Sequence, residues 1–248
     1  LFGAFLRIKD NYKLSTDRGE YIVKVYVVCD VRESFPSYVD GVSYNDHPKK
    51  ENVFEIINII SGLGYDCELF GGIPELIHAY DSNIQFRDCF FLNFTDGLTQ
   101  DYSRIQAPML MELLNVAYSG ASPFASAVLN NKHYSKLALE GYPVLRPAGI
   151  LINKILSYSK KSIDNLGYPI IVKPNTGGSS IGIKNDSVCF NYGDTEKKIK
   201  ELTENFDEII IEKYIAGYDV TNLLIGNEEY CPINEVIVTE SHDKLIQD

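Results

Sequence analysis

Short apolar runs bounded by polar and turn-forming residues divide the first part of the chain. The run IVKVYVVCD (22–30) predicts a buried strand, and NVFEIINIISGLG (52–64) predicts a helix closed by glycine. Two more runs, DCELF (66–70) and DCFFLNF (88–94), predict further strands. A strand, a helix and a strand in succession indicate a parallel sheet. We therefore predict an α/β domain at the front of the chain.

Helical periodicity follows, and then the pattern changes. Residues 101–117 predict one helix, and residues 118–144 begin with turn-forming residues and lead into a second helix that ends at Gly141. After Pro147, short strand-like pieces alternate with glycine and asparagine turns, which indicates a more antiparallel α+β unit. These pieces are AGILIN (148–153), YPIIVKP (168–174), SSIGIKN (179–185), EIIIEKYI (208–215), VTNLLIGN (220–227) and EVIVT (235–239).

Charge and apolar run length narrow the class of partner. The 248 residues carry 23 basic and 34 acidic side chains, for a net charge of −11, and the basic residues are scattered. This distribution provides no electrostatic footprint for a nucleic-acid backbone. The longest apolar runs fall far short of the roughly 20 residues that a membrane span needs. We expect neither a nucleic-acid partner nor a membrane span.

The cysteines and histidines form no recognisable metal or disulfide pattern. Five cysteines are isolated, odd in number and without a C-x-x-C pair, and the four histidines show no H-x-x-x-H or H-E-x-x-H spacing. Cysteines within apolar runs are more often buried thiols than nucleophiles. We expect a reducing cytoplasm and no metal-ligating set. Residues 1–21 show no secretory pattern, and we treat them as an N-terminal extension of unknown role.

One glycine-rich stretch suggests a ligand. In IVKPNTGGSSIGI (171–183), Lys173 ends an apolar run and glycines and serines follow. Backbone N–H groups in such a loop can approach a phosphate, and a lysine supplies a cation. The lysine precedes the glycines, unlike the common phosphate loop, and SSIGIKN then predicts a strand. The residues alone leave two interpretations, a hairpin that folds over a ligand and a surface hairpin with solvated Lys173.

Three segments, in this order and spacing, resemble the ATP-grasp enzymes, most closely the D-alanine–D-alanine ligase family. They are NNKHYSKLALEGYPV (130–144), YPIIVKPNTGGSSIGI (168–183) and IIIEKYIAGYDVT (209–221). The stretch before them, residues 91–129, also resembles that family, so the similarity covers roughly Phe90 to Thr221. Each segment alone is a weak signal, but the three segments in this order are together specific for the family.

The resemblance implies a fold and a domain division. We expect an α/β and α+β protein with the ATP-grasp fold and a Rossmann-like pre-ATP-grasp domain, incomplete at the C-terminus. The expected domains are 22–118 for the pre-ATP-grasp part and 119–248 for a truncated ATP-grasp part, with a lid subdomain at about 148–215.

The resemblance also implies the residues that bind nucleotide. Lys132 and Lys173 would contact the ATP phosphates, Glu212 would accept from the adenine amino group, and Asp219 would meet the ribose hydroxyls. Without the resemblance, Lys132 would be a solvated helix lysine like Lys136. The full expected set is Lys132, Lys173, Gly178, Ser179, Ser180, Glu212, Lys213, Tyr214, Ile215 and Asp219.

Within that set, Gly178, Ser179 and Ser180 would form the loop that closes over the triphosphate, and Ser179 is the one candidate catalytic residue. The backbone from Lys213 to Ile215 would read the base.

The chain departs from the family in the loop Thr176-Gly177-Gly178, where relatives usually have a polar residue, a glutamate and a glycine, and at two further places. Relatives have a glycine-rich segment with a serine and a glutamate after the first strand, whereas this chain has CDVRESFPSYVDGVSYNDHP (29–48), in which Glu33 or Asp46 could replace that glutamate. The family's C-terminal aspartate, glutamate and asparagine, which bind magnesium, have no counterpart after Asp219. The amino-acid substrate and the metal site are therefore both open.

We predict an ATP-dependent carboxylate–amine ligase that forms a dipeptide or amide through an acylphosphate, as the resemblance implies. Its cofactors would be ATP and, in the complete enzyme, Mg²⁺, and its substrates would be amino acids. A role in peptidoglycan biosynthesis and a homodimer are further implications. The alternative is a non-catalytic or truncated nucleotide-binding module that lacks the metal site.

Overall fold

The computed structural model divides the chain into two compact units. Apart from four short strands after Gly217, the described residues of unit 1 lie between Val23 and Ala127, and those of unit 2 lie between Val128 and Gly217. The structure describes residues 23–35, 47–98, 102–153, 158–178 and 180–217, and the backbone of four short strands beyond them.

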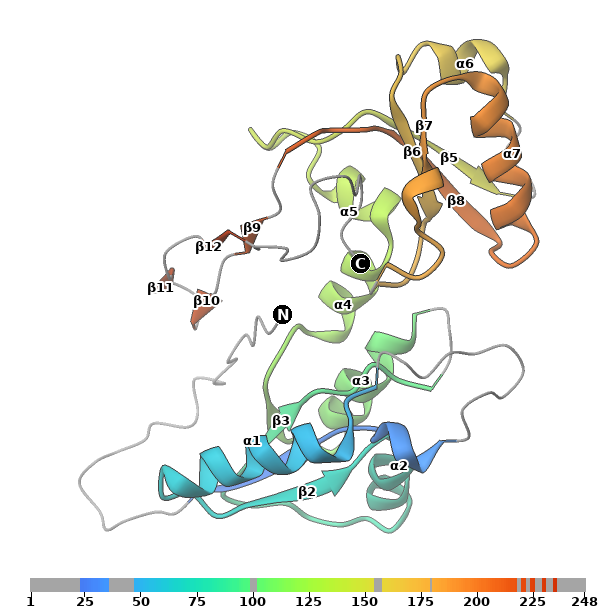
Figure 1. Ribbon diagram of the computed structural model, residues 1–248. Coiled ribbons are helices and arrows are strands. Elements are labelled where there is room, and N and C mark those ends of the chain that lie inside the picture. The colour runs from blue at the N-terminus through green and yellow to red at the C-terminus, as the bar shows by residue number, and fades with distance from the viewer. Residues whose placement is uncertain are drawn as a thin grey trace. The chain divides into compact units, whose positions relative to one another are not determined.

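Unit 1 is built on a four-stranded sheet in the order β2-β1-β3-β4, and every pairing in it is parallel (Figure 1). The parallel sheet predicted from the sequence is confirmed. Its strands are β1 (Lys24–Val28), β2 (Cys67–Gly71), β3 (Cys89–Asn93) and β4 (Ala117–Tyr118). Its helices are α1 (Lys50–Gly62), α2 (Ile73–Asp81) and α3 (Gln106–Leu113), with short 3₁₀ turns η1 (Arg32–Ser34) and η2 (Ser103–Ile105).

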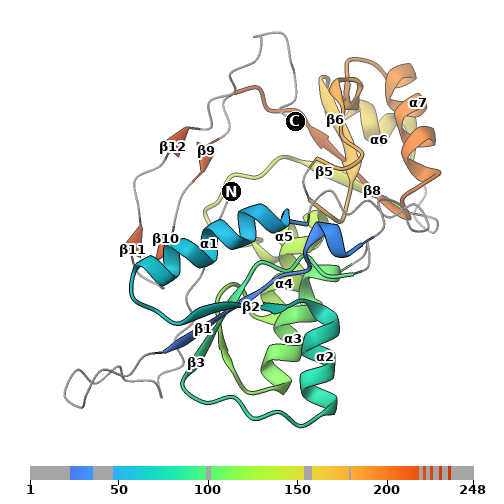
Figure 2. The ribbon, with the colours of Figure 1, turned by 60° about the horizontal axis from the view of Figure 1, so that its bottom comes forward.

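Helices cover both faces of this sheet, with α1 on one side and α2 and α3 on the other (Figure 2). Side chains of a strand alternate between faces, so a central strand with helices on both sides must be apolar throughout. Val27 packs with Val53 of α1, whereas Val28 packs with Leu76 of α2 and Met111 of α3. The apolar run of β1 from Val25 onward follows from this double coverage.

The sequence pattern did not predict α2. It is only nine residues long, and its buried stripe consists of Ile73, Leu76 and Ala79. The local signal lies at its start, where Gly72 N–H donates to Glu75 Oε2 at 2.7 Å and Pro74 occupies the first turn.

The helix predicted to end at Gly141 is in fact two helices, α4 (Pro123–Asn130) and α5 (Lys132–Ala138). Asn131 breaks the run because its backbone is extended and its side-chain oxygen accepts from Tyr134 N–H at 2.9 Å. An asparagine in this position caps the N-terminus of the following helix.

Unit 2 contains a four-stranded antiparallel sheet in the order β5-β8-β6-β7 (Figure 1). Helix α7 and the short helix α6 pack on one face of it, and Ile199 and Leu202 of α7 meet Ile211 of β8 in the core. The elements are β5 (Gly149–Asn153), α6 (Lys160–Asp164), β6 (Ile170–Pro174), η3 (Asn185–Ser187), β7 (Val188–Cys189), α7 (Tyr192–Thr203) and β8 (Glu208–Lys213).

The stretch SSIGIKN, predicted as a strand, contains no strand among its described residues, and a turn lies there instead. Ser180 and Gly182 both have left-handed backbone conformations, with φ of 57° and 75°, which a strand does not allow. The return strand of the hairpin comes later, at β7, where Val188 and Cys189 pair with Ile171 and Ile170. The hairpin is therefore real, but its loop is longer than the sequence pattern predicted.

Four short strands follow Gly217. β10 (Leu224–Ile225) pairs with β11 (Glu229–Tyr230), and β9 (Val220–Thr221) pairs with β12 (Asn234–Glu235). Most of the predicted strand EVIVT lies outside the described residues. Across the described part of the chain, every helix is too short or too polar to span a bilayer.

Candidate functional site

The face of the unit 2 sheet away from α7 carries the charged residues of the candidate site. Ile209 and Ile211 of β8 point into the core with α7, so Glu212 lies on the opposite face. The same alternation puts Lys173 of β6 on that face, because Val172 belongs to the core. Strand periodicity therefore brings the two predicted site residues to one surface.

Glu212 accepts hydrogen bonds from two lysines. Its Oε1 lies 2.5 Å from Lys136 Nζ, and its Oε2 lies 2.6 Å from Lys173 Nζ. The carboxylate is only 5% exposed, and the two lysine side chains are 17% and 22% exposed. Burial acts to raise the pKa of Glu212, but the charges and hydrogen bonds of Lys173 and Lys136 outweigh it, so the pKa is lowered. Glu212 is therefore a buried, ionised carboxylate.

Lys136 corrects the sequence interpretation, which took it as an example of a solvated helix lysine. It lies four residues after Lys132 on α5, and residues with that spacing share a helix face. That spacing is the signal that could have placed it beside the site.

Lys132, predicted to meet phosphate, binds the glycine-rich loop. Its Nζ donates to the backbone oxygens of Thr176 at 3.3 Å and Gly177 at 3.1 Å. Its backbone N–H donates to Asn175 O at 2.9 Å, and Asn131 forms a bridge with Thr176. The start of α5 is thereby joined to the end of β6, so Lys132 and Lys173 both attach to the same strand and loop.

Asn175 makes this junction with all four of its polar groups. Its side-chain Oδ1 accepts from His133 N–H at 2.9 Å, and its Nδ2 donates to Glu208 Oε2 at 2.8 Å. Its backbone oxygen accepts from Lys132 and its backbone N–H donates to Glu208 O at 3.0 Å. The residue is fully buried. We call these four hydrogen bonds the Asn175 clasp.

The glycine-rich loop turns sharply after the clasp. Gly177 has φ of 82°, and a Cβ added there would meet nothing within 4 Å, whereas a Cβ on Gly182 would lie 2.9 Å from Pro174 and 3.0 Å from Phe206. Gly178 and Ser180 are half-buried in this loop. Ser179, the candidate catalytic residue, lies outside the described residues, and so does Asp219.

The segment predicted to read a base is partly engaged in holding the strands. Lys213 N–H donates to Ala148 O and Tyr214 N–H donates to Pro169 O. The Lys213 ammonium donates to the oxygens of Gly167 and Tyr168, both at 2.9 Å. Ile215 is 68% exposed. Base recognition at this segment therefore has to use other groups than these two N–H donors while the strands stay paired.

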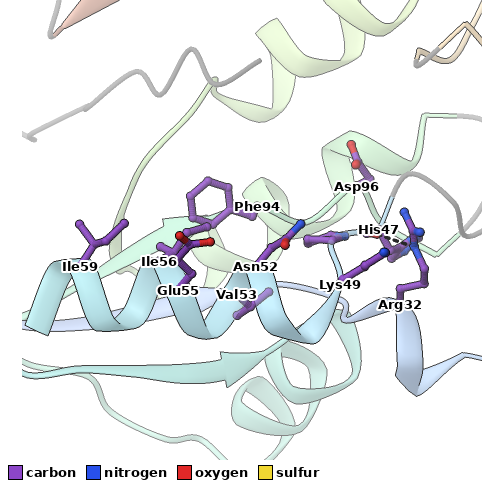
Figure 3. Close-up of a pocket in the computed structure, with 11 residues that line it drawn as sticks. Arg32, His47, Lys49, Asn52, Val53, Glu55, Ile56, Ile59, Phe94 and Asp96 are labelled. Carbon is purple, nitrogen blue, oxygen red and sulfur yellow. Dashed lines mark hydrogen bonds between the residues drawn. The ribbon is translucent and has the colours of Figure 1, made fainter. Parts of the chain in front are cut away.

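Unit 1 contains a pocket of about 610 Å³ at the carboxyl end of β1 and β3 (Figure 3). One end is mainly apolar, with Ile56 and Ile59 of α1 near Phe94 and the carboxylate of Glu55 beside them, and the other end is charged. The charged end contains Arg32, His47, Lys49 and Asp96 (Figure 3).

Glu33, one of the two acids proposed from sequence, does not line this pocket. Glu33 is exposed, and its Oε2 accepts from Lys50 N–H at 2.9 Å, so it caps the start of α1. The hydrogen bonds to the backbone hold the pKa of Glu33 below its ordinary value. Asp46 lies outside the described residues.

The same edge of the sheet has two buried polar atoms, Asp30 Oδ2 and Thr95 Oγ1, with no hydrogen-bond partner among the described groups.

Among the residues that the structure describes, no three histidine, cysteine, aspartate or glutamate side chains gather as a metal site would require. The described residues therefore do not provide the magnesium site that the family resemblance implies.

Comparisons with known proteins find relatives of similar sequence and similar fold. A family described as "D-ala D-ala ligase C-terminus" matches residues 135–245, which include Lys136, Lys173 and Glu212. D-alanine–D-alanine ligase A of Bacillus cereus is 32% identical over 119 residues, which are 48% of this chain and 38% of that protein. The protein is D-alanine–D-alanine ligase-like, with an ATP-grasp fold. D-alanine–D-alanine ligase of Borrelia recurrentis is similar to a longer part of this chain. It is 30% identical over 203 residues, which are 73% of this chain and 54% of that protein.

Solved structures show the same fold. The crystal structure of D-alanine–D-alanine ligase from Bacillus anthracis complexed with ATP matches with a TM-score of 0.65 and 21% identity, over 89% of this chain and 68% of that one. The ligase from Coxiella burnetii matches with a TM-score of 0.63 and 17% identity, over 87% of this chain and 71% of that one. This ligase-like chain thus spans 38% and 54% of the length of the two curated relatives named above.

Proposed function

We propose that the protein is an ATP-dependent carboxylate–amine ligase that forms a dipeptide or an amide through an acylphosphate. The observation that carries the proposal is the Asn175 clasp, which joins Lys132 to the strand and loop of Lys173 on the face that holds Glu212. Two cations and a glycine-rich loop in one place suit a polyphosphate.

Within the proposed reaction, these residues bind and orient the nucleotide. Lys132 and Lys173 would neutralise phosphate oxygens, and the loop N–H groups from Gly177 onward would donate to them. The carboxylate of one substrate would attack the terminal phosphorus of ATP to release ADP, and an amine would then displace phosphate from the acylphosphate. The assignment of residues 148–215 as the lid subdomain is part of the same proposal.

The unit 1 pocket is the proposed site for the amino-acid substrate. Ligands of open parallel sheets bind beyond the carboxyl ends of the strands, where neighbouring connections leave in opposite directions. The connection from β1 leads through α1 to β2 on one side, and β3 lies on its other side. The pocket, with one charged and one apolar end, lies at this point.

The family resemblance implies further properties, which we propose as well. They are amino-acid substrates, Mg²⁺ in the complete enzyme, a cytoplasmic location, a role in peptidoglycan biosynthesis and a homodimer. The four cysteines that the structure describes are all free thiols, which is consistent with a reducing compartment.

The test has two stages. Calorimetry should detect ADP and ATP binding, and Lys173→Ala should weaken it by about tenfold to a hundredfold, because a charged hydrogen bond is lost. Asp219→Ala should weaken the binding of ATP but hardly affect the binding of a 2′,3′-dideoxy analogue, because that analogue lacks the ribose hydroxyls that Asp219 would meet. A folded sample without nucleotide affinity would end the proposal. Phosphate release with Mg²⁺ and a panel of D- and L-amino acids then tests catalysis.

The second candidate is a nucleotide-binding module without catalysis. It is favoured by the missing acidic cluster among the described residues. We expect this 248-residue chain alone not to ligate amino acids, because phosphoryl transfer needs a metal held by carboxylates. The product of the full gene should release phosphate if the ligase proposal is correct. Nucleotide binding with no turnover by that product would support the module.

A further inference from the structure

The Lys136–Glu212 pair is built by three elements of unit 2. Lys136 comes from α5, Glu212 from β8, and Gly149 of β5 lies directly opposite Glu212 in the sheet. A Cβ on Gly149 would lie 2.7 Å from Lys136 Nζ and 3.0 Å from Glu212 Cγ. The missing side chain at Gly149 therefore leaves the space in which the lysine reaches the carboxylate.

This arrangement creates a difficulty for Lys173. The proposed function needs its ammonium at a nucleotide phosphate, but here it binds Glu212 Oε2 at 2.6 Å. Moving Lys173 to a phosphate would remove one counter-charge from a carboxylate that is almost fully buried. A buried charge without a partner is strongly unfavourable. Some other cation has to stay with Glu212.

We propose that Lys136 is a positioning residue for nucleotide binding. It keeps Glu212 ionised and in place while Lys173 passes from the carboxylate to the phosphate. The inference rests on the proposed function, since it needs a nucleotide at this face. Lys136 acts through Glu212 and Lys173, and it does not need to touch the ligand.

Two other lysines of the candidate site are directed elsewhere. Lys132 donates to the loop oxygens of Thr176 and Gly177, and Lys213 donates to the oxygens of Gly167 and Tyr168. Lys136 has one further acceptor, Pro147 O at 3.5 Å, in the segment that leads into β5. Its position is thus fixed from two sides, and Glu212 is the charged group that it meets.

The test is a double-mutant cycle read by calorimetry with ADP and with adenosine. In Lys136→Met, Glu212 has Lys173 as its one remaining lysine partner among those described, and it should retain it. We expect ADP affinity to fall by about tenfold or more, in line with the loss of a charged hydrogen bond. The affinity for adenosine, which lacks phosphate, should fall by about threefold or less, which is a smaller loss of binding free energy than that expected for ADP.

The second arm removes the carboxylate charge. In the Glu212→Gln background Lys173 is no longer held by a charge, so adding Lys136→Met should change ADP affinity by less than about threefold. The comparison of Glu212→Gln with the double variant can still be made if Lys136→Met alone does not fold. Lys136→Arg keeps the charge and should bind ADP much as the unchanged protein does.

Lys198→Met is the matched control, because Lys198 is also a buried lysine in unit 2 with two carboxylate partners, Asp186 and Glu201. It should lower stability without changing the ratio of ADP to adenosine affinity. Equal losses for ADP and adenosine in Lys136→Met, or a full Lys136→Met loss in the Glu212→Gln background, would overturn the inference. Failure of the unchanged protein to bind ADP would instead overturn the proposed function.

Discussion

At the scale of single residues, three lysines of unit 2 have the same chemistry and different partners. Lys132 binds loop carbonyls, whereas Lys173 and Lys136 share one buried carboxylate. The partner of each lysine depends on which groups lie next to the helix or strand that carries it. The residue type alone could not predict these partners. The family resemblance proposed Lys132, Lys173 and Glu212 as site residues, whereas the pairing of Lys136 with Glu212, 76 residues away, is seen only in the fold.

Gly149 gives a stability prediction at this scale. Gly149→Ala would place a Cβ 2.7 Å from Lys136 Nζ and 2.8 Å from Ile211 O, and overpacking of this kind costs about 1–3 kcal/mol. Urea unfolding should show a loss of that size. Gly62→Ala is the control, because a Cβ there meets nothing within 4 Å at the end of α1. The two variants should not be equally stable.

Glu212 gives a pH prediction. Its pKa in the folded protein is lowered from the ordinary 4.5, so its contribution to stability is present above that ordinary value and is lost as the pH falls through the lowered one. The free energy of unfolding should therefore fall with acidity below about pH 4.5. Glu212→Gln should flatten this part of the profile, measured by denaturant unfolding at a series of pH values. An unchanged slope would contradict the assignment.

At the scale of elements, the sequence predicted the strands well and the polar helices poorly. β1, β2, β3, β5, β6 and β8 all lie within or overlap the predicted runs, because most residues of these strands are apolar even where a charged residue lies among them. Helix α7 gave no such signal, since its buried positions are Thr195, Lys198, Ile199 and Leu202, of which two are polar. Its start is marked by Asn191, whose side chain accepts from Asp194 N–H.

Lys198 supplies the prediction for this helix. Its side chain is 3% exposed, and its ammonium binds Asp186 at 2.7 Å and Glu201 at 3.1 Å, which ties α7 to η3. Burial acts to lower the pKa of Lys198, but its hydrogen bonds to Asp186 and Glu201 outweigh it and raise the pKa. We expect Lys198→Ala to lower the free energy of unfolding by about 1–3 kcal/mol. Lys200→Ala, at an exposed pair in the same helix, should change it by less than about 0.5 kcal/mol.

At the scale of the whole molecule, the fold class was predictable because two different signals agreed. The strand–helix–strand order indicated the parallel sheet of unit 1, and the three ordered segments indicated the ATP-grasp fold. The unit 1 pocket was not predictable in the same way. Its lining comes from the segments around β1, α1 and β3, and only the pairing of these strands in the sheet brings Arg32 and Phe94 together. The acid that the sequence suggested there, Glu33, serves as a helix cap.

The Asn175 clasp has a consequence for how far the chain can tolerate changes in length. Two of its four hydrogen bonds fix α5 against the end of β6, and the other two hold Asn175 to Glu208 of β8, so the spacing of Lys132 and Lys173 in space does not depend on the number of residues between them. The exposed segment around Tyr142 and Leu145 can then lengthen, since doubling a loop costs only about 0.6 kcal/mol. A glycine–serine insertion there should leave ADP affinity within about threefold by calorimetry, whereas the same chain with Asn175→Asp, which sets a second carboxylate against Glu208, should not tolerate it.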